Sequence, residues 1–269
     1  MTAIARQYFP VALRAILAVA LAVVLVPLGP AGGVRASGNP GSGSLGFDMS
    51  YPQCGAVGGL GQINPGTAYQ FAILGVNHGR PFSQNPCLAA EYQLASARGM
   101  TVSLYMNLDF PRSDTRLTGT GAAVAQGCAA GDEACASYNY GWYAAQDAYA
   151  SAARVLGSLG AASVPGSWWI DIEVANYWSP DPSMNVRVIQ GAIDFFQETV
   201  GQSAVGIYSI GTMWTEITGA DYRPGVPVWL AGAHSLAMAG QLCTAPSLTG
   251  GPITLVQYAT PLLDLDYAC

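Results

Sequence analysis

Two carboxylates lie two residues apart at the end of an apolar, aromatic segment. The run Trp168–Ile170 leads directly into Asp171, Ile172 and Glu173. In a β-strand, residues i and i+2 point to the same face, so both acids would project together from a buried element. Burying two like charges side by side raises the pKa of at least one of them. A carboxyl with a raised pKa beside an ordinary one suits acid–base cleavage of a glycosidic bond.

Other acids also fall at the ends of predicted strands. Asp48 ends the first predicted strand, and Asp264 follows the last one. For any single Asp, a helix cap or a solvated loop is the simpler interpretation. In an α/β barrel, however, the carboxyl ends of the strands gather on one face, where active sites form. The common placement of these acids therefore favours one shared cleft.

The elements that must position these acids are short apolar strands alternating with helices. Predicted strands cover 45–48, 70–76, 101–107, 168–172, 204–209, 228–231 and 253–258, and predicted helices cover 87–98, 140–159 and 186–200. Ser183 is a candidate N-cap for the last helix. Helices become sparse after Val200, so we expect loops there. The alternation predicts a parallel α/β fold, and the number of short strands favours a single-domain, irregular (β/α) TIM-like barrel.

The N-terminal residues 1–36 have the pattern of a secretory signal peptide. Arg6 and Arg14 precede an apolar run, and Val34 and Ala36 form a small-x-small cleavage site. An uncleaved membrane anchor is the alternative, because residues 11–28 approach the length of a bilayer span. We interpret 37–44, rich in Gly and Ser, as a flexible leader and 45–269 as the barrel. The chain is thus predicted to be secreted and extracellular, without membrane contact after cleavage.

Six cysteines lie in the exported part, which predicts three disulfides, with free buried thiols as the alternative. Sequence proximity favours Cys128–Cys135, and the remaining pairs would be Cys54–Cys87 and Cys243–Cys269. A zinc site is disfavoured, because the chain has only His78 and His234 and no CxxC pair. We expect no metal.

Composition excludes several classes of function. Hydrophobic residues make up 51% and charged residues 10%, which suits a large core. The chain has no lysine, which excludes a Schiff-base or phosphate-loop lysine. The net charge of −6 disfavours nucleic acid as a partner. The glycines near Gly58 do not form a dinucleotide fingerprint, so no cofactor is expected. Residues 206–211 contain a serine between glycines, but their spacing does not match the nucleophile elbow of a serine hydrolase.

Aromatic residues are concentrated near the acid pair. Tyr177 and Trp178 follow it directly and are predicted to form a platform for a sugar ring. Trp168 and Trp169 serve core packing equally well, and alternation puts Trp169 on the face of the acids. His234 is predicted to lie in a loop or at the rim of the cleft.

Five short motifs follow one another in order between Phe47 and the C-terminus. They are D-x-S-x-x-Q at 48–53, D-x-E at 171–173, G-x-Y-S at 206–209, W-x-A at 229–231, and Q-Y at 257–258 followed by D-x-D at 264–266. This series resembles glycoside hydrolase family 25, the lysozyme-type muramidases. Each motif is weak alone, but their common order is fairly specific.

The resemblance implies an irregular α/β barrel that cleaves the β-1,4 bond after N-acetylmuramic acid in peptidoglycan. Glu173 would be the general acid/base, and Asp171 would orient or stabilise, including by positioning the substrate's own acetamido group as the nucleophile. Asp48 and Asp264 would complete the acidic cleft. The partner would be a glycan, bound by a monomeric protein. Candidate substrate contacts are Tyr177, Trp178, Trp229, Gln257, Tyr208, Asn107 and Asp266.

The sequence departs from the family in the walls of the predicted cleft. Residues 76–79 stand where the family has an arginine-containing stretch. Tyr105-Met106-Asn107 stands where its third strand often ends in Tyr-His, and Asp266 replaces the usual asparagine. Residues 115–136, with two cysteines, form an additional excursion. A non-catalytic glycan-binding or cell-surface domain on the same barrel is the alternative function. Retention of all four acids favours the enzyme.

Overall fold

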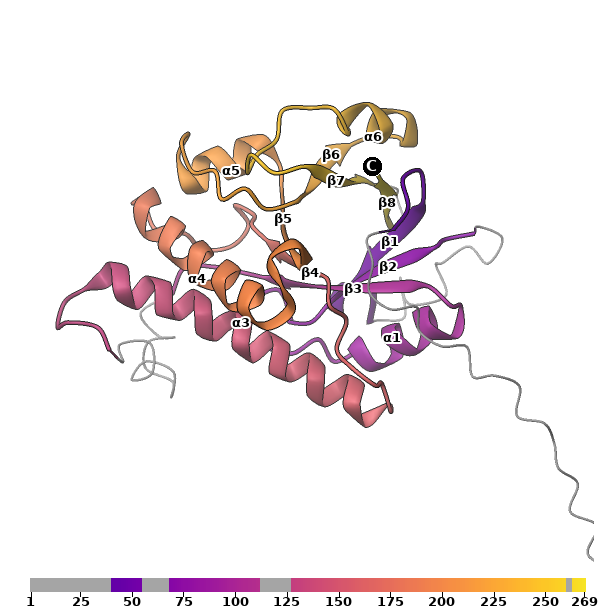
Figure 1. Ribbon diagram of the computed structural model, residues 1–269, viewed down its shortest axis with the longest axis horizontal. Helices are drawn as coiled ribbons and strands as arrows, with labels where there is room; N and C mark the ends of the chain where they lie inside the picture. Colours follow the sequence, from indigo (N-terminus) through magenta and orange to yellow (C-terminus); the bar gives the residue numbers. More distant parts are fainter. Residues whose placement is uncertain (1–39, 55–67, 112–126, 260–262) are drawn as a thin grey trace, which may run out of the picture. The chain divides into compact units, whose positions relative to one another are not determined.

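The computed structural model describes residues 40–54, 68–111, 127–259 and 263–269 (Figure 1). These residues all belong to one compact unit, Gly32–Cys269. The predicted signal peptide, the start of the predicted leader and residues 115–126 of the predicted excursion lie outside the described residues. Within the described part of the chain, no helix is both long enough and apolar enough to cross a membrane.

Eight strands, hydrogen-bonded in sequence order, close into a barrel (Figure 1). They are β1 Leu45–Met49, β2 Phe71–Gly75, β3 Thr101–Asn107, β4 Trp168–Asp171, β5 Val205–Ser209, β6 Val228–Ala233, β7 Ile253–Ala259 and β8 Asp264–Ala268. The predicted barrel is confirmed. The sheet is mixed rather than wholly parallel, because β8 runs antiparallel to both β7 and β1.

The direction of β8 corrects the predicted position of Asp264. Asp264 begins β8 instead of following the last strand. It pairs in register with Ala259 at the end of β7 and with Asp48 on β1. Because β8 runs back from the rim where β7 ends, its first residue lies at the same rim as the carboxyl ends of the parallel strands. Asp264 therefore reaches the expected face by a different route.

The helices differ from the prediction in extent and number. They are α1 Leu88–Ala97, α3 Glu133–Ser158, α4 Pro182–Val200, α5 Gly211–Thr218 and α6 Leu236–Leu242, with short 3-10 helices η1 Tyr51–Cys54 and η3 Gln202–Ala204. Helices α5 and α6 occupy regions where loops were predicted. The N-cap of α4 is Asp181, not Ser183, because the Asp181 carboxylate accepts the backbone N–H of Ser183. Helix α3 begins at Glu133, where the Asp132 side chain caps it.

Helices α3 and α4 lie side by side (Figure 1) and approach each other closely at two glycines. A Cβ added at Gly141 would lie 1.8 Å from the Val188 carbonyl oxygen, and one at Gly191 would lie 2.0 Å from that of Tyr138. Glycine allows this approach of two backbones. The Trp168 ring of β4 stacks on Phe196 of α4 at 4.6 Å, which joins the strand of the acid pair to the helix layer.

The opposite face of β4 contributes to the inside of the barrel. Trp169 belongs to a cluster of buried hydrophobic side chains inside the barrel: Phe71, Ile73, Tyr105, Trp169, Trp229, Leu255 and Ala268. Trp168 and Trp169 thus both serve packing, on opposite faces, as strand alternation requires.

Three disulfides join loop and helix ends: Cys54–Cys87, Cys128–Cys135 and Cys243–Cys269. The pair favoured by sequence proximity, Cys128–Cys135, and the two remaining predicted pairs are all present. The first bond links η1 to the start of α1, and the last links the end of α6 to the C-terminus. Backbone pairing also extends beyond β1 into the predicted leader, because Gly43 N–H donates to Ala268 and Ala268 N–H donates to Ser44.

Candidate active site

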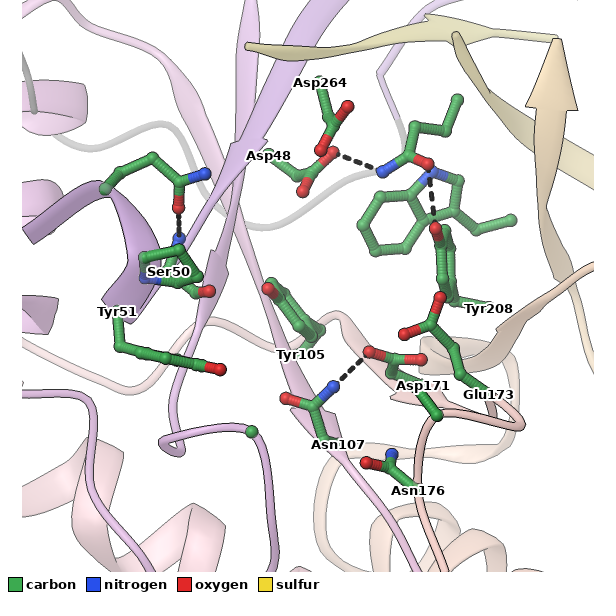
Figure 2. Close-up of a pocket in the computed structure, with 16 residues that line it drawn as sticks. Asp48, Ser50, Tyr51, Tyr105, Asn107, Asp171, Glu173, Asn176, Tyr208 and Asp264 are labelled. Atoms are coloured by element: carbon green, nitrogen blue, oxygen red, sulfur yellow. Dashed lines mark hydrogen bonds between the residues drawn. The ribbon is translucent and has the colours of Figure 1, made fainter. Parts of the chain in front are cut away.

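A cavity of about 300 Å³ opens at the barrel rim (Figure 2). All four predicted acids, Asp48, Asp171, Glu173 and Asp264, line it. The other lining residues are Ser50, Tyr51, Pro52, Gln53, Gly79, Tyr105, Asn107, Ala175, Asn176, Tyr208, Trp229 and Gln257. No Arg or His occurs among these described lining residues, so the cavity is acidic and supplies no cation of its own.

Asp171 is the buried end of β4. Its side chain is only 4% exposed, and Asn107 of the neighbouring strand β3 donates its amide N–H to Oδ2 (Figure 2). The other oxygen, Oδ1, is buried without a hydrogen-bond partner among the described residues. Burial raises the pKa of Asp171 well above its ordinary value, the charges of Glu173 and Asp48 raise it further, and the Asn107 bond lowers it. The carboxyl therefore favours the protonated form.

The backbone of Asn107 is itself fixed by the side chain of Asn77, which the sequence analysis did not single out. Asn77 Nδ2 donates to the Asn107 carbonyl at 2.8 Å, and Asn107 N–H donates to Asn77 Oδ1 at 3.0 Å. Asn77 follows β2 and is 1% exposed. Its position within the stretch 76–79, where the sequence departs from the family, was the available signal.

Glu173 lies just beyond β4 in a loop held by several backbone contacts. Ile172 N–H donates to the Tyr208 carbonyl, and the Ser209 hydroxyl donates to the Ile172 carbonyl at 2.7 Å. The Glu173 carbonyl accepts the Trp178 indole N–H at 2.8 Å. The side chain is half-buried and points into the cavity. Burial, followed by the charge of Asp264, raises its pKa. Glu173 thus combines access to the cavity with a raised pKa.

Asp48 and Asp264 lie on the other side of the cavity (Figure 2). Gln257 Nε2 donates to Asp48 Oδ2 at 2.8 Å, and the Tyr208 hydroxyl donates to Gln257 Oε1 at 2.8 Å. Burial and then the Asp264 charge raise the pKa of Asp48 well above its ordinary value. Burial also raises the pKa of Asp264. Because the ionised form of each of these acids is disfavoured, their carboxyls stay protonated at pH values at which exposed carboxyls are ionised.

Three predicted substrate contacts lie outside the cavity lining. Trp178 packs behind the acid loop, with its indole N–H used by Glu173, and Tyr177 is 44% exposed beside Phe110. Asp266 is fully buried below the cavity and accepts the Trp229 indole N–H. His234 is exposed and also absent from the lining. The remaining predicted contacts, Asn107, Tyr208, Trp229 and Gln257, do line it.

Tyr51 supplies an aromatic wall that the sequence analysis missed. Figure 2 shows it across the cavity from Glu173. Its ring lies 3.9 Å from that of His78, and Gly79 fits against it so closely that a Cβ there would be 3.1 Å from the Tyr51 hydroxyl. Tyr51 falls at a variable position of the D-x-S-x-x-Q motif, so the motif alone did not identify it.

No protein-family model and no curated protein matches this chain. Among the described residues, no three His, Cys, Asp or Glu side chains are arranged to hold a metal ion.

Solved structures with the same fold were found, at low sequence identity. A bacterial lysozyme from Streptomyces coelicolor is 16% identical with a TM-score of 0.52, over 85% of this chain and 93% of that one. A muramidase from Trichobolus zukalii is 17% identical with a TM-score of 0.50, over 84% and 93%. The catalytic domain of an endolysin from a Listeria monocytogenes bacteriophage is 16% identical with a TM-score of 0.50, over 86% and 95%. The resemblance inferred from the motifs is therefore confirmed at the level of the fold.

Proposed function

We propose that this protein is a divergent muramidase-like glycoside hydrolase, which cleaves β-1,4 glycosidic bonds of peptidoglycan by carboxylate acid/base catalysis. The observation that carries the proposal is the meeting of Asp48, Asp171, Glu173 and Asp264 in one cavity. Three of the acids come from strands, and Glu173 comes from a loop. Asp48 and Asp171 are buried, and Asp48 pairs with Asp264 where β8 meets β1 and closes the barrel. The fold, which is that of structurally known muramidases, supports the same conclusion.

Glu173 has the best position for proton transfer. It is the least enclosed member of the acid pair, and its raised pKa keeps a proton available in weakly acidic solution. In the proposed reaction this proton passes to the glycosidic oxygen as the bond to the anomeric carbon breaks. Glu173, then ionised, accepts a proton from the incoming water.

Asp171 is suited to orient the substrate or to stabilise charge. Asn107 fixes one of its oxygens, and the other, Oδ1, is buried and has no hydrogen-bond partner among the described residues. The carboxyl can accept the acetamido N–H of an N-acetylated sugar. The carbonyl oxygen of that acetamido group would then be the nucleophile that attacks the anomeric carbon as the glycosidic bond breaks. Asp48 and Asp264 keep the cavity acidic and raise the pKa values of their neighbours.

The cavity walls fit a sugar chain. The Tyr51 ring offers an apolar face on one side, and the side chains of Tyr208, Gln257 and Asn176 offer polar groups on the others. Aromatic faces stack on sugar rings, while amides and hydroxyls bond their hydroxyl groups. We infer that the glycan is bound between Tyr51 and Glu173.

A non-catalytic glycan-binding domain is the second candidate. It is favoured by the protonated state of several acids, because a neutral carboxyl both donates to and accepts from sugar hydroxyls. The two candidates differ at Glu173, since a binder needs no proton transfer there.

The test is the release of reducing ends from bacterial peptidoglycan by residues 37–269, prepared with the disulfides oxidised. Glu173→Gln removes the proton donor while keeping the shape of the side chain, and Glu216→Gln makes the same change at an exposed position of α5 outside the cavity lining. We expect the wild type and Glu216→Gln to be active and Glu173→Gln to be inactive. Lack of wild-type activity on several bacterial walls, with retained glycan binding, would establish the binding domain instead.

The pH dependence tests the role of Glu173 separately. Because its pKa is raised, the protonated form persists above the ordinary range of a glutamate and is lost as the pH rises through the raised pKa. We therefore expect an optimum in the weakly acidic to neutral range. A rate that stays constant into strongly alkaline solution would exclude Glu173 as the acid.

We also propose that residues 1–36 are a cleaved signal peptide and that the protein is secreted as a monomer. The three disulfides support an oxidising destination. Intact mass and N-terminal sequencing of the exported protein should show Ser37 as the first residue. Recovery of the uncleaved chain in the membrane fraction would identify an anchor instead.

A further inference from the structure

Asp266 is a carboxyl enclosed in the barrel, one layer below the cavity. On β8 it follows Asp264 by two residues, so both side chains face the barrel interior. It pairs in register with Gly46 of β1 and Gln257 of β7, and none of its surface is exposed to solvent. The proposed reaction uses the acids at the rim and leaves this one without a role.

The contacts of Asp266 indicate a neutral carboxyl. Oδ1 accepts the Trp229 indole N–H at 2.7 Å, whereas Oδ2 is buried and has no partner among the described residues. Burial raises the pKa of Asp266 well above its ordinary value, and Asp48 and Asp264 raise it further, against a lowering by the Trp229 bond. An unpaired charge in this position would be strongly unfavourable, so the proton stays on the buried carboxyl.

Trp229 connects Asp266 to the cavity. Its indole lines the cavity, and its ring lies 4.5 Å from that of Tyr208 and 5.9 Å from that of Tyr105. The Tyr208 hydroxyl in turn binds Gln257, which binds Asp48. The direction of the indole therefore affects both the floor of the cavity and the hydrogen bonds of one of its acids.

We propose that Asp266 is a positioning residue that fixes the Trp229 indole at the cavity floor, and that its carboxyl is neutral in the folded protein. Ionisation would place a negative charge below Asp48 and Asp264 and would require water in the packed interior. The inference rests on the proposed function only for its activity measurement.

The groups that face Asp266 determine how it responds to pH. Asp48 of β1 and Asp264 of β8 are acids, and β6 presents the uncharged Trp229 indole. Burial, and then the charges of Tyr69 and Asp266, raise the pKa of Tyr258 of β7. None of these groups is a cation, and only the hydrogen bond from the Trp229 indole favours an ionised Asp266.

The decisive experiment compares Asp266→Asn with the wild type, each purified after export from cells that express the full chain. Asparagine keeps an oxygen that can accept the indole N–H, and it is neutral at every pH. Asp264→Asn, two residues away and half-buried, is the matched control. Thermal unfolding is measured from pH 4 to pH 9.

The expected sign follows from the raised pKa. Stability due to the protonated carboxyl is fully present below the unfolded-state pKa of about 3.9 and is lost as the pH rises through the folded-state pKa. Relative to the wild type, the unfolding temperature of Asp266→Asn should therefore increase as the pH rises. This increase should be steeper than the one for Asp264→Asn. Parallel curves for Asp266→Asn and the wild type would overturn the proposal.

A second measurement tests the positioning of the indole. We expect the fluorescence of Trp229, obtained as wild type minus Trp229→Phe, to change at alkaline pH before unfolding, and to stay constant in the Asp266→Asn background. An identical pH response in both backgrounds would contradict the proposal.

Kinetics separate positioning from a general loss of structure. Asp266→Ala removes the acceptor and should raise KM about ten-fold with a smaller change in kcat, and Asp266→Asn should restore KM at pH 5. Equal KM values for both variants would contradict positioning. If the protein cleaves no glycan at all, the proposed function fails, but the unfolding and fluorescence measurements still decide the role of Asp266.

Discussion

The acids on the two sides of the cavity are held in different ways. On the β4 side, Asp171 and Glu173 belong to one short segment, and neighbouring parallel strands fix it through the Asn107 amide and the Ser209 hydroxyl. On the β1–β8 side, Asp48 and Asp264 are far apart in the sequence and are direct partners in the antiparallel pairing of β1 with β8. The Gln257 bond to Asp48 spans 209 residues of sequence.

Because of this difference, substitutions on the two sides should differ in how they affect the reaction rate and the stability of the fold. The β4 side is anchored by hydrogen bonds from the neighbouring strands β3 and β5 that do not involve the other acids, so its acids can act in a fixed geometry. The β1–β8 side exists only when the barrel closes, and closure brings buried acids together at a cost that depends on pH. We therefore expect changes on the β4 side to affect the rate, and changes on the β1–β8 side to affect stability as well.

The largest effect should come from comparing one acid on each side. Glu173→Gln should lower kcat by about 10³-fold, because it removes the proposed proton donor. Asp264→Asn should lower kcat by only about 10-fold, because it removes a neighbouring charge rather than the donor. Steady-state kinetics on peptidoglycan fragments measure both. Equal losses would show that the two sides share the chemistry and would remove the distinction.

The next effect concerns how the free energy of unfolding depends on pH, with Glu91 of α1 as a reference outside the cavity. Glu91 is 1% exposed, and burial raises its pKa to about 7, against a lowering by the Asn85 bond. Its stabilisation is fully present below about pH 4.5 and is lost as the pH rises to about 7, a loss of roughly 3 kcal/mol. Glu91→Gln should remove this loss in urea unfolding experiments.

Asp48→Asn should act in the same direction, because the pKa of Asp48 is also raised. Asn replaces a carboxyl that loses its proton at a cost as the pH rises, so the variant should gain stability over the wild type above about pH 4. If Glu91→Gln reduces the pH dependence of the free energy of unfolding and Asp48→Asn does not, Asp48 on the β1–β8 side does not contribute to that dependence.

A smaller effect should follow from removing the Asn107 amide on the β4 side. Asn107→Ala leaves Asp171 without its hydrogen-bond donor and should reduce kcat by about 10- to 100-fold, since the carboxyl loses its fixed orientation. Asn176→Ala is the control, because this amide also lines the cavity but binds the Leu108 carbonyl instead of an acid. A similar loss in both variants would mean that the loss of a cavity amide, rather than of the Asp171 bond in particular, is responsible.

The same two sides show what the sequence could predict. The Asp171–Glu173 pair was recognisable because its signal is local: two acids at strand spacing after an apolar run. Asp264 was assigned to the correct face for an incorrect reason, because nothing local shows that a strand after β7 returns antiparallel. Asp266 was predicted to touch substrate, but its burial depends on the closure of β8 onto β1.

Side chains far apart in sequence were the hardest to predict. Tyr51 and Asn77 gain their roles from contacts with His78 and Asn107, which lie 27 and 30 residues away. The aromatic pair after the acids, predicted as a sugar platform, lies outside the cavity lining, although Tyr177 is exposed. In the structure the loop bends so that the Trp178 indole turns back to the Glu173 carbonyl.

That indole bond provides the smallest and sharpest test of the β4 side. Trp178→Phe keeps an aromatic ring but removes the donor to the Glu173 carbonyl, and a hydrogen bond of this kind contributes about 1 kcal/mol, so kcat should fall about five-fold. Trp214→Phe is the matched control, because its buried indole N–H has no partner among the described residues. If only Trp178→Phe lowers kcat while KM stays constant, the loop fixes the acid for proton transfer. If KM rises instead, Trp178 contributes to substrate binding, and the β4 side does more than hold Glu173 in position.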